Sequence, residues 1–211
     1  RNDPPVIRAR IKAVTVASII SALIVWYFNT TQYNVWTLLG VLPQQPVLHL
    51  LSVVSRPLLL TGLLFLGPIS MMFFEEELPF QKHFVFRRDI VDIFTSLQGQ
   101  RNYVVGPLTE EFVFRACVIA ILFQAHYSKK YLIFASPLYF GLAHLHHTWE
   151  NYNAFGRNSR ALKRAIFVSL FQFTYTTIFG WYASFLFIRT NHVLPPILCH
   201  SFCNIMGVPD I

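Results

Sequence analysis

The sequence predicts an all-α fold, a polytopic bundle of transmembrane helices around a polar intramembrane cavity, and three observations favour it. Of the 211 residues, 54% are hydrophobic and 13% are charged, against about 25% charged residues in soluble domains. The stretches 13–55, 57–74 and 165–188 contain no Asp, Glu, Lys or Arg. Only a few of the apolar segments contain ionisable residues, and each of those segments contains several polar residues close together. Because a soluble helix needs a polar face, the pattern excludes a soluble globular domain, a coiled coil and a disordered chain.

Seven apolar segments are predicted to be helices of this bundle, since a span needs about 20 mostly apolar residues. In chain order they cover residues 13–28, 35–54, 57–74, 107–125, 131–147, 165–188 and 192–207. Segment 35–54 is the exception, because Gly40, Pro43, Gln44, Gln45 and Pro46 lie near its middle. Prolines and amides at that depth favour a broken or re-entrant helix.

Two later segments contain helix signals of their own. Gly106 and Pro107 predict a helix start, with proline in the first turn. Gly141 and Ala143 allow a neighbouring helix to approach closely.

Segment 75–106 mixes acidic, basic and phenylalanine residues and is not a span. It is expected to be an interfacial helix or a solvated loop.

Charge indicates sidedness and excludes one class of partner. The net charge is +7, but the basic residues lie between apolar segments, as juxtamembrane charges do, and form no nucleic-acid-binding stripe. If 35–54 re-enters, most of them fall on the side of 1–12, 75–106 and 148–164, which is then cytosolic. We expect a single integral-membrane domain over 1–211, with its motifs in 107–207. Because residue 1 is Arg rather than Met, we expect a fragment of a longer chain.

Glu110, Glu111 and Arg115 form the first polar motif. Near the predicted helix start, the helix dipole favours the two acids. Glu111 and Arg115 are one turn apart and should pair. Glu110 lies about 100° around the helix with no local cation, which makes it a candidate general base. The alternative is a structural ion-pair and capping cluster of all three.

Two further motifs carry imidazoles. Phe140 precedes His144 by four residues, and His144 lies deepest among the neighbouring histidines. Its alternative role is a hydrogen bond between helices. His200 and Asn204 share a helix face, and two donors on one face suit an oxyanion hole. The alternative is a polar pair that joins two helices.

Because buried polar groups must find partners, these motifs are expected to converge on one cavity, where several chemistries are conceivable. Zinc held by Glu110, His144 and His200 is disfavoured, since the sequence lacks the His-Glu-x-x-His helix. A Cys203 nucleophile would lack a general base opposite it, and no Gly-x-Ser-x-Gly turn supports a serine nucleophile. The favoured scheme is a water activated by Glu110 and His144, with His200 and Asn204 stabilising the oxyanion, and with no metal or cofactor.

The order Glu110-Glu111-x-x-x-Arg115, Phe140-x-x-x-His144 and His200-x-x-x-Asn204 resembles the type II CAAX prenyl endopeptidases, the Ras-converting glutamate intramembrane proteases of the CPBP family. The resemblance implies removal of the last three residues of prenylated CAAX proteins. It implies Glu110 as base, His144 as its partner, and His200 with Asn204 as the oxyanion hole. Glu111, Arg115 and Phe140 match motif positions with structural or substrate-orienting roles.

The same resemblance implies a location and partners. The chain is expected in the endoplasmic reticulum membrane, with its site open to the cytosol, acting on farnesylated or geranylgeranylated proteins such as Ras-like small GTPases. A lipid-facing site suits this substrate, because each buried CH₂ of a prenyl chain contributes about 0.8 kcal/mol. Two other hypotheses stay open: a membrane scaffold that binds prenylated tails without cleaving them, and a proton-coupled transporter.

Overall fold

The computed structural model describes residues 2–42 and 47–207, with only the backbone of 47–49, and this part of the chain is helical without a strand. Elements labelled η are stretches of wider, π-type turns. The elements are α1 (Pro4–Tyr27), α2 (Val35–Leu38), α3 (Val47–Leu64), α4 (Leu66–Phe74), η1 (Arg87–Val91), α5 (Asp92–Thr95), α6 (Leu97–Gly99), η2 (Gln100–Val105), α7 (Gly106–Glu111), η3 (Phe112–Cys117), α8 (Val118–Gln124), α9 (Lys129–Phe134), α10 (Ser136–Ala143), α11 (His146–Ala154), α12 (Ser159–Thr190) and α13 (Leu194–Met206). The predicted all-α fold is confirmed.

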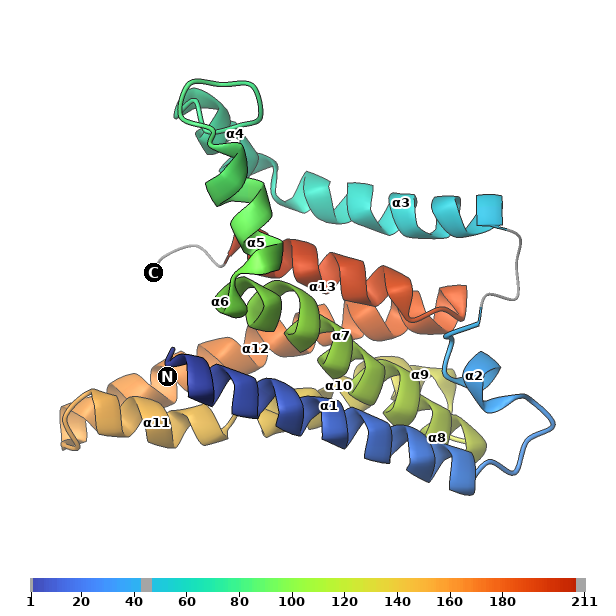
Figure 1. Cartoon of the computed structure of the whole chain (residues 1–211). Coiled ribbons are helices and arrows are strands. Elements are labelled where there is room, and N and C mark those ends of the chain that lie inside the picture. Colours follow the sequence, from blue (N-terminus) through green and yellow to red (C-terminus); the bar gives the residue numbers. More distant parts are fainter. Residues whose placement is uncertain (1, 43–46, 208–211) are drawn as a thin grey trace.

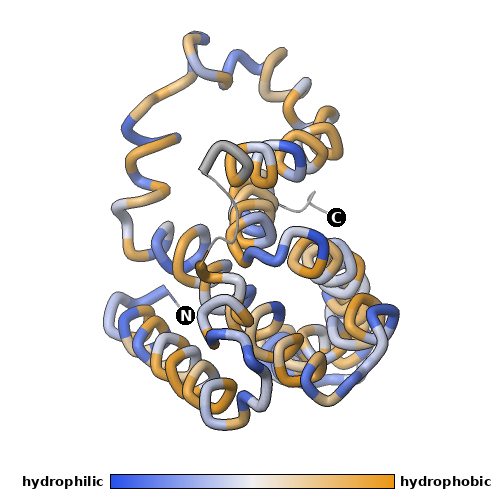
Figure 2. Tube along the Cα trace, turned by 90° about the vertical axis from the view of Figure 1, so that its right-hand side faces the viewer, coloured by the Kyte–Doolittle hydropathy of each residue, from blue (hydrophilic) through white to orange (hydrophobic). Residues whose placement is uncertain are grey.

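Helix α13 occupies the middle of the bundle (Figure 1). It packs against α3 on one side and against α7, η2 and α12 on the others. Helix α1 lies along α7 and η3, and α10 and α11 both pack on the long helix α12. The segment from α4 to α5 extends away from the other helices, and the chain rejoins them at α6 (Figure 2). This arrangement brings α7 into contact with α13 and places α10 against η3, which continues α7.

The predicted span boundaries hold only in part. Segment 35–54 is broken as expected, since α2 ends at Leu38 and α3 begins at Val47; Pro43, Gln44, Gln45 and Pro46 lie outside the described residues. The prediction of a single helix over 131–147 is wrong, because the helix is interrupted at Ala135 and again after Ala143. Pro137, which lacks an N–H, lies in the first turn of α10, just after the first interruption. Segment 75–106 combines a loop with the short helices that begin at η1.

Helix α7 begins at Gly106 as the sequence suggested, but this start is not a free helix end. Helical turns run without interruption from Leu97 to Gln124, and Pro107 lies inside this run. The wider turns of η2 come directly before it. Proline removes an amide hydrogen bond in a helix interior, and we attribute its tolerance here to the change from π-type to α-helical turns. The two glutamates therefore lie within a continuous helix and have no free helix N-terminus beside them.

By length and apolar character, one helix in the described ranges, α1, can cross a bilayer alone. Residues Leu50–Leu64 and Leu66–Phe74 form a pair bent by 67°, which is either one broken span or a re-entrant segment. The seven predicted segments therefore do not appear as seven long, uniformly apolar helices. Helix α12 has 32 residues, but Thr, Tyr and Gln interrupt its apolar character.

The distribution of side chains nevertheless matches packing in lipid. Large apolar residues such as Leu63, Phe167 and Ile178 are exposed, whereas residues of these types are most often buried in water-soluble proteins. Small residues such as Ala183 and Ser184 are buried between helices. Small residues inside and large apolar residues outside are typical of transmembrane bundles, in which close backbone approach replaces the hydrophobic effect.

Gly180 shows how tight this packing is. A Cβ atom at Gly180 in α12 would lie 2.6 Å from Cβ of Pro137 and 3.1 Å from Nη2 of Arg115. Because the proline ring cannot rotate away, Gly180→Ala should force α10 and α12 apart and cost about 1–3 kcal/mol. The measurement is the thermal unfolding midpoint of the detergent-solubilised protein.

Gly62→Ala is the matched control for this prediction, because a Cβ at Gly62 in α3 would have no neighbour within 4 Å. Alanine there should leave the midpoint unchanged or raise it, since it favours helix. An equal effect of the two substitutions would contradict the tight packing at Gly180.

Candidate active site

The centre of the polar cluster is the fully buried carboxylate of Glu111 on α7. Its Oε2 atom lies 3.1 Å from Nε of Arg115, one turn further along, and its Oε1 atom lies 2.8 Å from Nδ1 of His200 on α13. The side chains of Glu111 and Arg115 are 0% and 1% exposed. The expected pair of Glu111 and Arg115 is present. Glu111 also joins α7 to α13, because one carboxylate binds a cation and an imidazole at once.

Arg115 lies among aromatic rings. Its guanidinium carbon is 4.7 Å from the ring centre of Phe140 and 6.0 Å from that of Phe179. Cation–π attraction is favourable when a cation is shielded from water. Phe179 was not singled out from the sequence, because a phenylalanine within the apolar stretch 165–188 carries no signal of its own.

Glu110 lies on the other side of His200. Its Oε2 atom is 3.8 Å from Nε2 of His200, and its side chain is 37% exposed, unlike that of Glu111. The two neighbouring glutamates therefore differ in access: Glu111 is sealed among protein groups, and Glu110 is open to an incoming molecule. A group that takes a proton from water must be reachable by water, so Glu110 suits that role better than Glu111.

His144 follows the last residue of α10, with its Nδ1 atom 2.8 Å from the carbonyl oxygen of Phe140. A carbonyl only accepts hydrogen bonds, so Nδ1 carries the proton and Nε2 carries the lone pair. Within the described ranges, no hydrogen bond or ion pair joins His144 to Glu110. The Phe140 ring lies near both imidazoles. Its centroid is 4.5 Å from that of the His144 ring and 6.4 Å from that of the His200 ring.

Asn204 lies one turn beyond His200 on α13 and is exposed. Its Nδ2 atom donates to the backbone carbonyl oxygen of Asn102 in η2, at 2.9 Å. This bond orients the amide and leaves its second N–H for another acceptor. Asn102 was not predicted, because its contribution is a main-chain carbonyl, which any residue type could supply.

The alternative chemistries find little support in this geometry. Among the described residues, Glu110, His144 and His200 do not gather closely enough for all three to bind one metal ion. Cys117, Cys199 and Cys203 are free thiols. The site combines two carboxylates of different exposure, two imidazoles, an amide and a guanidinium.

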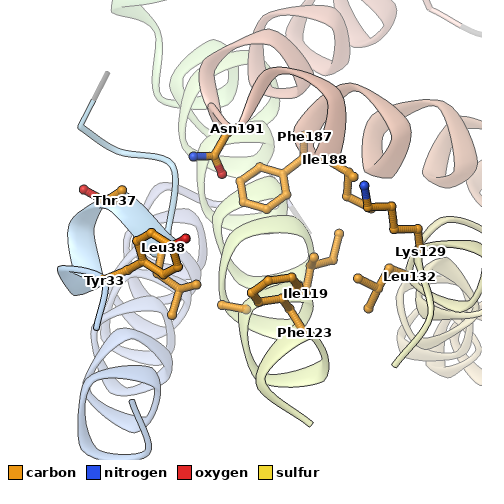
Figure 3. A pocket seen from close by; sticks show the side chains of 11 residues that line it. Tyr33, Thr37, Leu38, Ile119, Phe123, Lys129, Leu132, Phe187, Ile188 and Asn191 are labelled. Atoms are coloured by element: carbon orange, nitrogen blue, oxygen red, sulfur yellow. The ribbon is translucent and has the colours of Figure 1, made fainter. Parts of the chain in front are cut away.

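A separate cavity of about 280 Å³ lies elsewhere in the bundle (Figure 3). Its lining comes from α2, α8, α9, α12 and the adjoining turns and is mostly apolar. Tyr33, Leu38, Phe123 and Phe187 face it (Figure 3). Because its lining shares no residue with the polar cluster, this cavity is not the reaction site.

Comparison with known proteins gives a consistent result. A family model described as type II CAAX prenyl endopeptidase Rce1-like matches residues 93–206. A probable CAAX prenyl protease 2 of Schizosaccharomyces pombe is 35% identical over the whole chain, which covers 71% of that relative. CAAX prenyl protease 2 of Homo sapiens is 37% identical over the whole chain, which covers 64% of that relative. The Arabidopsis thaliana protein of the same name is 39% identical over 76% of this chain and 55% of its own length. No solved structure matches.

Proposed function

The chain belongs to the Rce1-like family of type II CAAX prenyl endopeptidases, and from this premise we propose that it hydrolyses the peptide bond that releases the C-terminal tripeptide of prenylated CAAX proteins. The observation that carries the proposal is the position of His200 between the buried Glu111 and the accessible Glu110. A carboxylate that orients an imidazole beside an accessible second carboxylate is an arrangement suited to acid–base catalysis.

In the proposed reaction, a water molecule hydrogen-bonds to Glu110 and to the Nε2 lone pair of His144. Glu110 accepts a proton as the water oxygen attacks the carbonyl carbon of the scissile bond. His200 acts here as an imidazolium, which donates from Nδ1 to Glu111 and from Nε2 to the oxyanion that forms. The amide of Asn204 donates the second hydrogen bond to this oxyanion. Glu110 then returns the proton to the leaving nitrogen as the C–N bond breaks. Glu111 and Arg115 act as positioning residues that fix the His200 ring.

The proposed substrates are farnesylated or geranylgeranylated proteins, including Ras-like small GTPases, at the endoplasmic reticulum membrane with the site open to the cytosol. The printed names of the relatives support prenylated CAAX substrates. The large exposed apolar side chains of the bundle support access from lipid. We further propose that 1–211 behaves as one domain, since α1 packs directly on α7.

The test uses the protein in lipid nanodiscs with a farnesylated peptide that ends in a CAAX sequence. We expect mass spectrometry to show a product shorter by three residues, and the same peptide without the prenyl group to react much more slowly. Activity should survive a strong zinc chelator, because the scheme uses no metal. Binding of the peptide without cleavage would support the scaffold hypothesis instead, and loss of activity on chelation would overturn the metal-free mechanism.

A further inference from the structure

Helix α11 presents two imidazoles and a carboxylate on neighbouring positions, outside the polar cluster described above. His146 and His147 occupy its first turn, and Glu150 lies one turn later. One nitrogen or oxygen atom from each of the three lies within 4.8 Å of the others. Zinc bonds to such atoms measure about 2.0–2.2 Å, so the ligand atoms around a tetrahedral ion lie about 3.3–3.6 Å apart. Side-chain rotation must bring these atoms closer together to bind one ion.

The ring of His146 is already oriented as a metal ligand requires. Its Nδ1 atom lies 2.7 Å from the carbonyl oxygen of Ala143. Because a carbonyl only accepts, the proton is on Nδ1 and the lone pair is on Nε2. A backbone carbonyl that fixes the tautomer in this way is the usual second partner of a histidine bound to a metal.

His147 and Glu150 are already in contact, with Nδ1 of His147 3.1 Å from Oε2 of Glu150. The other carboxylate oxygen, Oε1, lies 3.9 Å from Nη2 of Arg10 on α1. The carboxylate therefore already lies between positive or hydrogen-bonding groups at an exposed position. A divalent cation at this point would compete with a weak, solvent-exposed ion pair, which contributes little stability.

The helix that carries the cluster is held in place. Thr148 in α11 donates from Oγ1 to Oγ of Ser169 in α12 at 2.6 Å, and α11 packs along α12 (Figure 1). A ligand set on one fixed helix loses little conformational freedom on binding. The sequence HHTWENYNA of α11 is polar, so an ion can reach it from water.

We propose that His146, His147 and Glu150 form a surface site for a divalent transition metal of the zinc class, with water completing the coordination and Arg10 released from Glu150. Two imidazoles and one carboxylate are a donor set that favours zinc over calcium or magnesium, which prefer oxygen ligands. This site uses none of the hydrolytic residues, although the ring of His147 lies 6.0 Å from that of His144, and the proposal does not depend on the proposed function.

The test is equilibrium titration of the tag-free, detergent-solubilised protein with Zn²⁺ in competition with a chelating indicator, and with Co²⁺ observed by visible absorption. The wild type should bind one equivalent of metal tightly. His146→Ala and Glu150→Gln should each weaken binding about tenfold or more. His126→Ala, which removes an exposed imidazole on a different turn, is the matched control and should bind like the wild type. Mg²⁺ should not compete.

The outcomes are distinct. Circular dichroism shows whether each variant keeps its helices. Both ligand substitutions are at exposed or half-buried positions, so we expect the variants to fold. Zn²⁺ affinity that is unchanged in both His146→Ala and Glu150→Gln would overturn the proposal, as would affinity that is lost in His200→Ala but kept in His146→Ala. Hydrolysis that survives chelation would leave the site intact as a binding site, so the two proposals fail independently.

Discussion

Replacing Glu110 with Gln should lower the rate of tripeptide removal by about 100- to 10,000-fold, the range attributed to one general acid–base group, while the protein stays folded. The substitution keeps the shape of the side chain and removes its ability to accept a proton. Glu110 is partly exposed and makes its closest ionic contact at 3.8 Å, so its charge contributes little to holding the helices together. The measurement is kcat for a prenylated peptide, beside the thermal unfolding midpoint.

Glu77→Gln provides the control for this effect, because it makes the same chemical change at an exposed acid outside the polar cluster. It should leave both kcat and the unfolding midpoint unchanged. A Glu110→Gln protein that kept more than about half of the wild-type kcat would rule out Glu110 as the base. The remaining carboxylate of the site, Glu111, would then be the next candidate.

Local sequence rules predicted what depends on neighbours along one helix. The pair of Glu111 and Arg115 follows from a spacing of four residues, and the structure has it at 3.1 Å. The break within 35–54 was predicted from its glycine, prolines and amides together, and α2 does end at Leu38. Motif spacing also identified His200 as a polar group that needed a partner. Each of these inferences needs only the backbone geometry of a helix.

Contacts between helices could not be assigned from spacing. His200 contacts Oε1 of Glu111 but approaches Glu110 only to 3.8 Å. This difference depends on how α13 is rotated about its axis relative to α7. The bond from Asn204 to the main chain of Asn102 depends on η2 continuing into α7. Proline at 107 suggested a helix start instead, and the π-type turns before it have no residue signature. The proximity of His146, His147 and Glu150 on α11 was not predicted either.

Replacing Glu111 with Gln should destabilise the protein by about 3–5 kcal/mol, the cost of leaving a buried ion without its partner. Arg115 is 1% exposed and would keep its charge among aromatic rings. For a chain of this length, the unfolding midpoint should fall by roughly 6–20 °C. Activity should fall as well, measured well below that midpoint, because the amide of Gln can no longer hold His200 as a carboxylate does.

The double variant Glu111→Gln, Arg115→Met separates these two effects. Removing both charges takes away the unpaired cation, and a flexible apolar side chain can fill the space between Phe140 and Phe179. We expect the unfolding midpoint to recover most of its loss, while kcat stays low because His200 still lacks its anionic partner at Nδ1. If kcat recovered together with stability, Glu111 would serve only to neutralise Arg115. If neither recovered, the interaction that supports the fold would be the bond between Glu111 and His200, which ties α7 to α13, and the ion pair with Arg115 would be secondary.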